Sequence, residues 1–459
     1  MATTGERRGT GERRVIANVF KGSVGNLIEW YDWYAYTAFS VYFAHAFFPA
    51  GDQTAQLLNT AAVFAVGFLM RPIGGWLLGR YADRYGRRSA LTLSVTLMAV
   101  GSLVIALTPS YASIGVAAPI LLVLARLTQG VSVGGEYATS ATYLSEVASP
   151  GRRGFYSSFQ YVTLTAGQLT ALGVQIVLQQ TLSPAAMDSW GWRIAFVIGA
   201  AGAIVVMWLR RSMEESESFQ RESATAAGAG DKPKGGTLRA LLAHPKACLT
   251  VAGLTLGGTV AFYTYTTYLQ KFMINTSGID KASVAWINFL ALLVFVVLQP
   301  IAGALSDKVG RRPLLLFFGI AGTVCTVPLM SALAGTRSVV MAFFLMVAAL
   351  VIVTGYTSIN AIVKAELFPT SIRALGVGLP YALTVSIFGG TAEYIALLLK
   401  QSGHESLFFY YVSGCILVSL LVYARMTETS KTSPIEAEAR AAQAPPAGEA
   451  APEQQAAGR

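Results

Sequence analysis

The chain has 459 residues, of which 54% are hydrophobic and only 13% are charged, and its formal net charge is +10. Soluble domains are usually about 25% charged, so this composition excludes a soluble protein and indicates an integral membrane protein. The net positive charge alone could suggest a nucleic-acid partner, but the positions of the basic residues argue against one.

Twelve apolar segments recur along the chain, and each is close to or above the length of about 20 residues that crosses a bilayer core. In chain order they cover 19–47, 57–79, 89–108, 115–145, 155–180, 191–209, 247–275, 283–306, 313–334, 338–364, 372–400 and 406–425. We therefore predict an all-α membrane protein with twelve transmembrane helices.

A charged stretch rich in Gly, Ala and Ser interrupts this pattern at residues 210–246, with six apolar segments on either side of it. Its composition predicts a cytoplasmic linker between two six-helix bundles, at residues 19–209 and 247–425. Residues 1–18 are polar and basic, and we expect a cytoplasmic tail there rather than a cleaved signal peptide. Residues 426–459 are rich in Ala, Pro and Glu, so we expect a disordered cytoplasmic tail.

The basic residues are distributed unevenly between the two sides of the predicted membrane. With both termini placed inside, 27 of the 34 Lys and Arg fall in cytoplasmic segments and five fall outside. This asymmetry follows the positive-inside rule, which sets the orientation and accounts for the net charge. The remaining two, Arg71 and Arg126, lie within the membrane.

The first apolar segment contains "GNLIEWYDWYAYTAF", in which Glu29, Asp32 and Tyr36 share one helical face. An ionised carboxylate in hydrocarbon costs several kcal/mol, so this face needs a cationic partner, a proton or a water-filled cavity. Protonation of an acid here would free an Arg for a substrate carboxylate, which is a physical route to symport. We rank Asp32 first as the proton-coupling acid, followed by Glu136 and Glu29.

Arg71 and Arg126 remain charged at any accessible pH, so each needs an anion. Two interpretations stay open: permanent internal ion pairs with the nearby acids, or a site that binds substrate carboxylates bidentately. Gln129 and Glu136 share a face of the fourth helix with Arg126, and Gln129 is a candidate substrate ligand. Further candidates for hydrogen bonds or ion pairs with substrate, each of which could instead pack or pair locally, are Tyr36, Gln168, Tyr263, Lys364 and Glu393.

Two motifs occur once in each half of the chain. "GRYADRYGRR" (79–88) is matched by "GALSDKVGRR" (303–312), and "SEVASPGRRG" (145–154) by "AELFPTSIRALG" (365–376). Related motifs at corresponding places indicate an internal duplication.

With these motifs and the 6+6 layout, the chain resembles the major facilitator superfamily. Through "GNLIEWYDWYAY" and "ARLTQGVSVGGEYATSATYLSE" it is similar to the metabolite:proton symporters, and through "GRRGFYSSFQYVTL" and "FGGTAEYIALLLK" to their 2-oxoglutarate permease branch. The resemblance implies alternating access, with motif charges that lock the cytoplasmic mouth; simple topological anchoring by positive charge is the alternative. The implied gate residues are Asp83, Arg84, Arg87, Glu146, Arg153, Asp307, Arg311, Glu366 and Arg373.

The sequence therefore predicts a proton symporter that takes a small carboxylate into a bacterial cell across the inner membrane. The paired Arg residues favour an anion, and only the resemblance points to 2-oxoglutarate. Citrate, shikimate, a zwitterion such as proline or betaine, and export by proton antiport remain alternatives. We expect a monomer, no cofactor, no metal and no nucleic-acid partner, and no catalytic constellation indicates an enzyme.

Overall fold

The computed structural model describes residues 27–49, 51–85, 87–134, 151–211, 241–369 and 372–432. All regular structure within these residues is helical, and nine of the helices are long and apolar enough to cross a membrane. A helix at residues 27–47 and two shorter apolar helices within α3 and α5 complete the twelve predicted crossings. The predicted fold class is thus confirmed.

The N-terminal half contains the first six crossings and short helices in the loops at the end away from the repeated motifs. We call that end the outer end and the end that carries the motifs the inner end. After the helix at residues 27–47 come α2 (Gln53–Tyr85), α3 (Arg87–Leu107), α4 (Tyr111–Ile114), α5 (Ala117–Val133), α7 (Arg153–Thr181), α8 (Pro184–Ala186), a π-helical turn (Met187–Gly191) and α9 (Trp192–Arg211). The predicted segment 115–145 is thus seen as a helix to Val133, and residues 135–150 lie outside the described residues.

In the C-terminal half, π-helical turns interrupt two of the six crossings. The elements are α12 (Pro245–Tyr263), a π turn (Thr264–Tyr268) and α13 (Leu269–Asn275); α14 (Lys281–Val309); α15 (Arg311–Gly335); α16 (Val339–Thr357) with α17 (Asn360–Ala365); α18 (Arg373–Thr384), a π turn (Val385–Gly389) and α19 (Gly390–Gln401); α20 (Ser406–Arg425); and α21 (Thr429–Thr432). A π turn inserts an extra residue and so changes which face the following side chains occupy, and such turns often occur at functional sites.

Helix ends are fixed by local chemistry. Asp280 caps α14 by accepting a hydrogen bond from the Ser283 amide at 2.8 Å, and Ser338 caps α16 through the Met341 amide at 3.3 Å. Gly310 has a φ of +99° at the turn between α14 and α15, a conformation that favours glycine.

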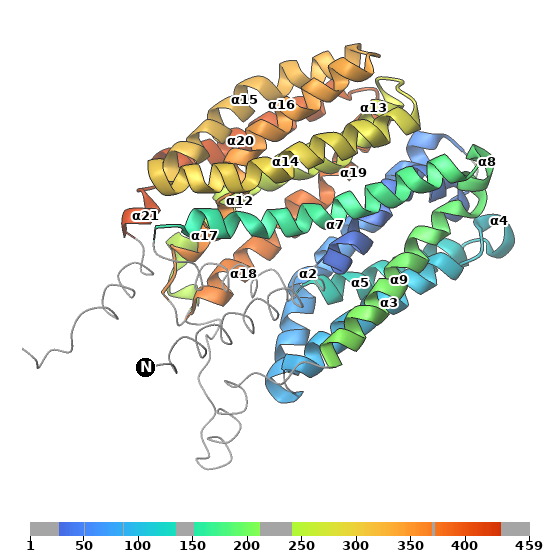
Figure 1. The fold of residues 1–459 in the computed structure, drawn as a ribbon, viewed down its shortest axis with the longest axis horizontal. Coiled ribbons are helices and arrows are strands. Elements are labelled where there is room, and N and C mark those ends of the chain that lie inside the picture. Colours follow the sequence, from blue (N-terminus) through green and yellow to red (C-terminus); the bar gives the residue numbers. More distant parts are fainter. Residues whose placement is uncertain are drawn as a thin grey trace, which may run out of the picture.

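The two halves meet along two helix pairs. Figure 1 shows α7 lying along α14, with α2, α3 and α9 on the other side of α7. Gly154 and Gly303 stand at the inner crossing of α7 and α14, where a Cβ on Gly303 would come within 2.5 Å of the Gly154 carbonyl oxygen. α2 packs against α19 through Phe68 and Gly390, and the Ser386 hydroxyl donates to the Phe68 carbonyl at 2.6 Å. Small residues thus allow the close approach of the halves.

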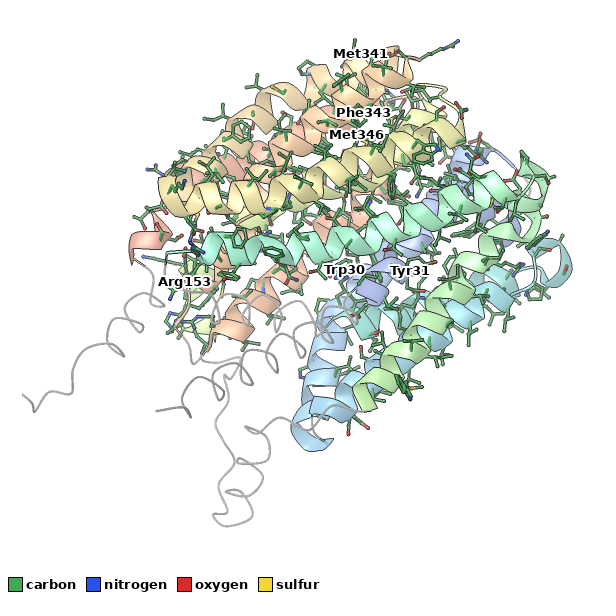
Figure 2. The ribbon with its side chains drawn as sticks, in the orientation of Figure 1. Trp30, Tyr31, Arg153, Met341, Phe343 and Met346 are labelled. Carbon is green, nitrogen blue, oxygen red and sulfur yellow. The ribbon has the colours of Figure 1, made fainter. Side chains whose placement is uncertain are left out.

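The interior contains both large apolar side chains and buried polar ones, while other large apolar side chains are exposed on the outside. Figure 2 shows Trp30 and Tyr31 near the centre of the molecule and Arg153 at the start of α7. By contrast, Leu107, Trp208 and Leu249 are about 70% exposed. Such exposure is unfavourable in water and suits a surface that faces acyl chains.

The predicted linker and tail are covered only in part. α9 extends to Arg211 and α12 begins at Pro245, and residues 212–240 lie outside the described residues. The start of the predicted tail contacts the bundle, because the Glu428 carboxylate accepts hydrogen bonds from the amides of Arg311 (2.8 Å) and Arg312 (3.0 Å). Residues 1–26 and 433–459 also lie outside the described residues.

Candidate functional site

Asp32 is fully buried in the N-terminal half and is held by hydrogen-bond donors from two other helices. The Ser102 hydroxyl of α3 donates to Oδ1, and the Gln129 amide of α5 donates from Nε2 to Oδ2 at 2.5 Å. Gly199 of α9 leaves space for this carboxylate, since a Cβ there would lie 2.6 Å from Oδ1. The Asp32 carboxyl group is therefore buried in the interior, where its hydrogen-bond donors, Ser102 and Gln129, are neutral.

Gln129 connects this acid to a guanidinium group. Its Oε1 accepts a hydrogen bond from Arg126 Nη1 at 2.8 Å, while its Nε2 donates to Asp32. Within the described residues Arg126 forms no direct ion pair with a carboxylate, and its Nε and Nη2 have no hydrogen-bond partner. The sequence placed Gln129 on this face as a possible substrate ligand; the structure makes it the bridge between cation and acid.

Aromatic rings surround both guanidinium groups. The Arg126 guanidinium carbon lies 4.0 Å from the ring centroid of Trp33 and 4.3 Å from that of Tyr36. The corresponding carbon of Arg71 lies 4.4 Å from the Trp33 centroid and 3.9 Å from that of Phe68. Cation–π contacts of desolvated groups contribute about 2 kcal/mol. The rings therefore help to stabilise the buried cations while leaving N–H groups at their edges for an anion.

A small cavity lies between the halves beside Arg71. Trp30 and Arg71 line it from the N-terminal half, and Tyr381 and Val385 line it from the C-terminal half. Its volume of about 30 Å³ accommodates one or two water molecules. This cavity beside Arg71 is too small for an organic substrate.

Of the other two candidate acids, the structure describes Glu29 but not Glu136. Glu29 is buried beside α5 and accepts a hydrogen bond from the Ser132 hydroxyl at 3.4 Å. Glu136 lies outside the described residues. Glu29, Asp32 and Tyr36 all point into the protein, as the helical spacing predicts, and the Tyr36 hydroxyl donates to the Thr60 carbonyl at 2.9 Å.

The C-terminal half contributes a buried ion pair that the sequence did not indicate. Glu393 of α19 pairs with Lys271 of α13, and both side chains are at most 5% exposed. Lys271 is one of the five basic residues that the sequence count placed outside, and its side chain is buried in the protein rather than exposed at the end of the crossing. The helix continues one turn beyond Lys271 and follows a π turn, which directs this side chain inward instead of toward the outer end.

The remaining candidates are buried at or near the boundary between the halves. Gln168 donates from Nε2 to the Thr266 carbonyl of the opposite half at 2.6 Å. Tyr263 packs edge-on to Phe68, with ring centroids 5.1 Å apart. Lys364 is fully buried; its ammonium donates to Asn360 Oδ1 at 2.8 Å and lies 3.8 Å from the ring centroid of Tyr381.

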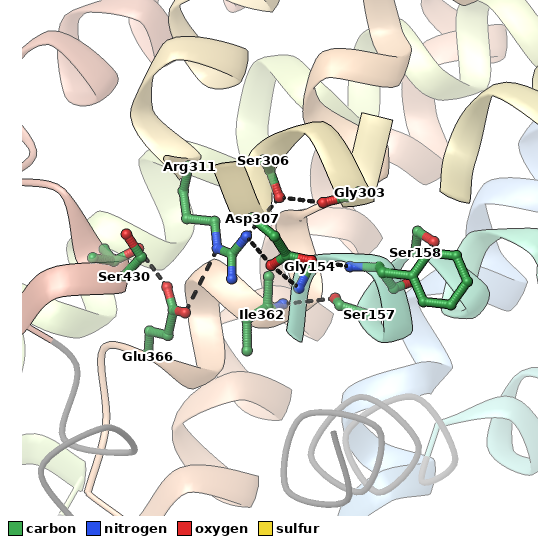
Figure 3. Close-up of polar contacts among 12 residues, drawn as sticks. Gly154, Ser157, Ser158, Gly303, Ser306, Asp307, Arg311, Ile362, Glu366 and Ser430 are labelled. Carbon is green, nitrogen blue, oxygen red and sulfur yellow. Dashed lines mark hydrogen bonds and ion pairs between the residues drawn. The ribbon is translucent and has the colours of Figure 1, made fainter. Parts of the chain in front are cut away.

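At the inner end, Asp307 joins the two halves (Figure 3). Its Oδ1 accepts from the Gly154 amide at 2.8 Å and its Oδ2 from the Phe155 amide at 2.9 Å, both at the start of α7. Arg311 Nη1 also donates to Oδ1, at 2.8 Å. A carboxylate at a helix N-terminus is stabilised by the free N–H groups and the helix dipole. The second copy of the first motif therefore ties α14 to the opposite bundle.

Glu366 extends this inner network. Its Oε1 lies 3.7 Å from Arg311 Nε, and its Oε2 accepts from the Thr429 hydroxyl at 2.5 Å. Burial, with a smaller contribution from Glu428, raises the pKa of Glu366 above its ordinary value, and Arg311, the Thr429 hydroxyl and Arg153 offset only part of this rise. Arg373, buried at the start of α18, donates to the Phe368 carbonyl at 3.3 Å.

The first copies of the motifs are described less completely. Asp83 and Arg84 lie in α2 and Arg87 begins α3, but their side chains are outside the described part of the structure. Glu146 is outside the described residues altogether. Of the residues predicted to form a symmetric gate, the structure therefore describes the contacts of the C-terminal copy most fully.

Comparison with known proteins is consistent with this geometry. The sequence profile of the Major Facilitator Superfamily matches residues 23–383 and 271–451. The chain belongs to the major facilitator superfamily. A solved superfamily structure, the partially occluded inward open conformation of the xylose transporter XylE from E. coli, superposes with a TM-score of 0.72 over 89% of this chain and 97% of that one. Its sequence identity of 18% supports the fold alone.

Relatives within the superfamily are considerably closer. The alpha-ketoglutarate permease of Escherichia coli (strain K12) is 53% identical over 89% of this chain and 93% of its own length. The citrate-proton symporter of Klebsiella pneumoniae is 32% identical over 92% of each chain. Membership in a family of transporters agrees with the expectation that the chain is not an enzyme.

Sequence reasoning missed Ser102 and Lys271 as parts of the buried polar network. A serine in an apolar helix carries no signal of its own, because most such hydroxyls bond to the backbone of their own helix. Lys271 did carry one signal, because it is a charged residue inside an apolar crossing; its direction could not be derived from helical spacing, since a π turn precedes it.

Proposed function

We propose that this protein is a proton symporter that takes up 2-oxoglutarate across a bacterial inner membrane. The observation that carries the proposal is the Arg126–Gln129–Asp32 chain, in which a buried acid is linked to a buried cation that has N–H groups without a partner among the described residues. Support for the substrate comes from the permease relative, which is 53% identical over nearly the whole chain.

Protonation and substrate binding would be linked through the amide of Gln129. When Asp32 is ionised, it accepts from Nε2, and Oε1 is thereby directed at Arg126. A protonated Asp32 becomes a donor, so the amide turns its oxygen toward Asp32 and its N–H groups toward Arg126. Two donors repel each other, Arg126 is released, and its guanidinium takes a substrate carboxylate.

Arg71 is the second proposed ligand on the N-terminal side, since it lines the cavity between the halves. Tyr36, Tyr263, Gln168 and Lys364 are proposed to line the site when it opens, and Glu29 and Glu136 to adjust its charge. Two cations suit an anion better than a zwitterion, because a zwitterion would bring its own positive charge next to them.

The charges at the inner end are proposed to form the cytoplasmic gate. Asp307 bonds to α7 of the opposite half, so that half can swing away only when those contacts break. By symmetry, Asp83, Arg84, Arg87 and Glu146 would serve the first copy, beside Arg153, Arg311, Glu366 and Arg373. Both termini are proposed to be cytoplasmic, in line with the positive-inside distribution, and the chain to work as a monomer in the lipid bilayer.

Uptake of labelled 2-oxoglutarate into proteoliposomes tests the proposal. An inward proton gradient of one pH unit is expected to raise the accumulated level of substrate about tenfold over no gradient if one proton is coupled, because about 1.4 kcal/mol of driving force multiplies an equilibrium by ten. A protonophore should abolish this accumulation. Unlabelled citrate and proline are competitors: stronger inhibition by either would reassign the substrate, and indifference to the protonophore would exclude symport.

A further inference from the structure

The Lys271–Glu393 ion pair has no place in the proposed proton mechanism, yet it is among the most deeply buried charge pairs that the structure describes. Its two side chains are 2% and 5% exposed, and Glu393 Oε2 has no hydrogen-bond partner within the described residues. Stability does not explain such a pair, because well-packed apolar residues of the same size are often as stable as a buried ion pair or more so.

This pair lies at the depth of Arg126. On α2, Phe64 lies one turn, about 6 Å, toward the outer end from Phe68, and its ring centroid is 5.4 Å from the Arg126 guanidinium carbon. On α19, Glu393 lies about 4.5 Å toward the outer end from Gly390, which contacts Phe68. Glu393 and the Arg126 guanidinium therefore both lie toward the outer end from the contact between Phe68 and Gly390, by similar distances along the helices.

Tyr36 lies near charged groups of both halves. Its ring is 4.3 Å from the Arg126 guanidinium carbon, and its hydroxyl is within electrostatic range of both Arg126 and Glu393. Lys271 is bonded to that Glu393 carboxylate, so each half places one cation in the neighbourhood of Tyr36. A molecule with a carboxylate at each end has the charge pattern that would span these two cations.

We propose that Lys271 binds the distal carboxylate of the transported dicarboxylate and gives the site its preference for two carboxylates over one. This proposal rests on the proposed function. An ammonium has three N–H donors, and within the described residues one of them is directed at Glu393. Glu393 is a positioning residue: it holds the ammonium in the interior and weakens dicarboxylate binding by its own charge.

The test compares two inhibitors of labelled 2-oxoglutarate uptake that differ only at the distal end. In 2-oxopentanoate a methyl group replaces the distal carboxylate of 2-oxoglutarate. The wild-type protein is expected to prefer unlabelled 2-oxoglutarate by about 10- to 100-fold, the value of one charge-assisted hydrogen bond. In the double variant Lys271→Met/Glu393→Met the preference should fall to within about threefold, with binding of 2-oxopentanoate nearly unchanged.

A matched control removes another Lys–Glu pair of the same half. Lys400 and Glu405, 3.3 Å apart at the outer end of α19, are changed to Met in the same way, and this variant should keep the wild-type preference. If Lys271→Met/Glu393→Met also keeps it, the buried pair is structural and the inference is wrong. If wild-type uptake is inhibited by neither compound, the proposed substrate is wrong, and the inference falls with it.

The single variant Glu393→Gln provides an independent test, because it removes the negative charge of Glu393 and keeps the positive charge of Lys271. The Gln oxygen still accepts from Lys271, so the ammonium stays in place while its competitor loses its charge. In this variant we expect thermal stabilisation by 2-oxoglutarate to occur at a ligand concentration at least about threefold lower than in the wild type. The response to 2-oxopentanoate should be unchanged. Equal shifts for both compounds would contradict a role in binding the distal carboxylate.

Discussion

Replacing Arg126 with Gln is expected to lower 2-oxoglutarate uptake by about 100-fold. The guanidinium donates to a carboxylate through two N–H groups, an interaction that contributes ~3 kcal/mol, and each 1.4 kcal/mol corresponds to a factor of about ten. Folding should be retained, because Asp32 keeps its hydrogen bonds from Ser102 and Gln129. Uptake into proteoliposomes and thermal unfolding of the purified variant measure the two effects separately.

Arg126→Lys is expected to be nearly as inactive. An ammonium lacks the planar fork that binds a carboxylate bidentately and lies flat on the rings of Trp33 and Tyr36. Arg337→Gln, at an exposed position beyond α15, removes the same charge and should transport normally. Near-normal uptake by Arg126→Gln would show that this guanidinium is a structural cation only.

Asp32→Asn is expected to abolish accumulation driven by a proton gradient while leaving exchange of substrate across the membrane within about threefold of wild type. The Asn side chain cannot titrate, and its oxygen still accepts from Ser102. The N–H group of the Asn side chain would donate to the Gln129 amide, as a protonated Asp32 does in the proposed mechanism. Arg126 would therefore be permanently available to substrate. Counterflow of labelled against unlabelled 2-oxoglutarate, compared with gradient-driven uptake, separates the two activities.

Asp188→Asn is the control for this substitution. Asp188 pairs with Lys281 at 3.6 Å near the outer surface, where both side chains are at least one-third exposed, and such pairs contribute little. Accumulation should persist in that variant. Accumulation by Asp32→Asn at the wild-type level would move the coupling proton to another acid.

The fold could be predicted from the sequence because each crossing is encoded locally. Apolar length alone specifies twelve helices, and the repeated motifs identify corresponding inner ends, where the structure finds Asp307 and Arg311 in contact. The inward direction of Asp32 followed from helical spacing. These features depend on residues that are close together in the chain.

What could not be predicted depends on contacts between distant segments. The amide of Gln129 bridges Asp32, 97 residues away, and Lys271 pairs with Glu393 across 122 residues. The direction of Lys271 also depends on a π turn, which no simple helical repeat reveals. The contacts of Glu428 with the start of α15 were missed because composition alone indicated a tail.

The most direct test of the account is to measure proton uptake on substrate binding. Purified protein in weakly buffered detergent solution, titrated with 2-oxoglutarate in the presence of a pH indicator dye, should take up about one proton per substrate bound when Asp32 is ionised beforehand. Asp32→Asn should bind 2-oxoglutarate and take up none. Equal proton uptake by both proteins would contradict the account, because the proton would then be bound without Asp32.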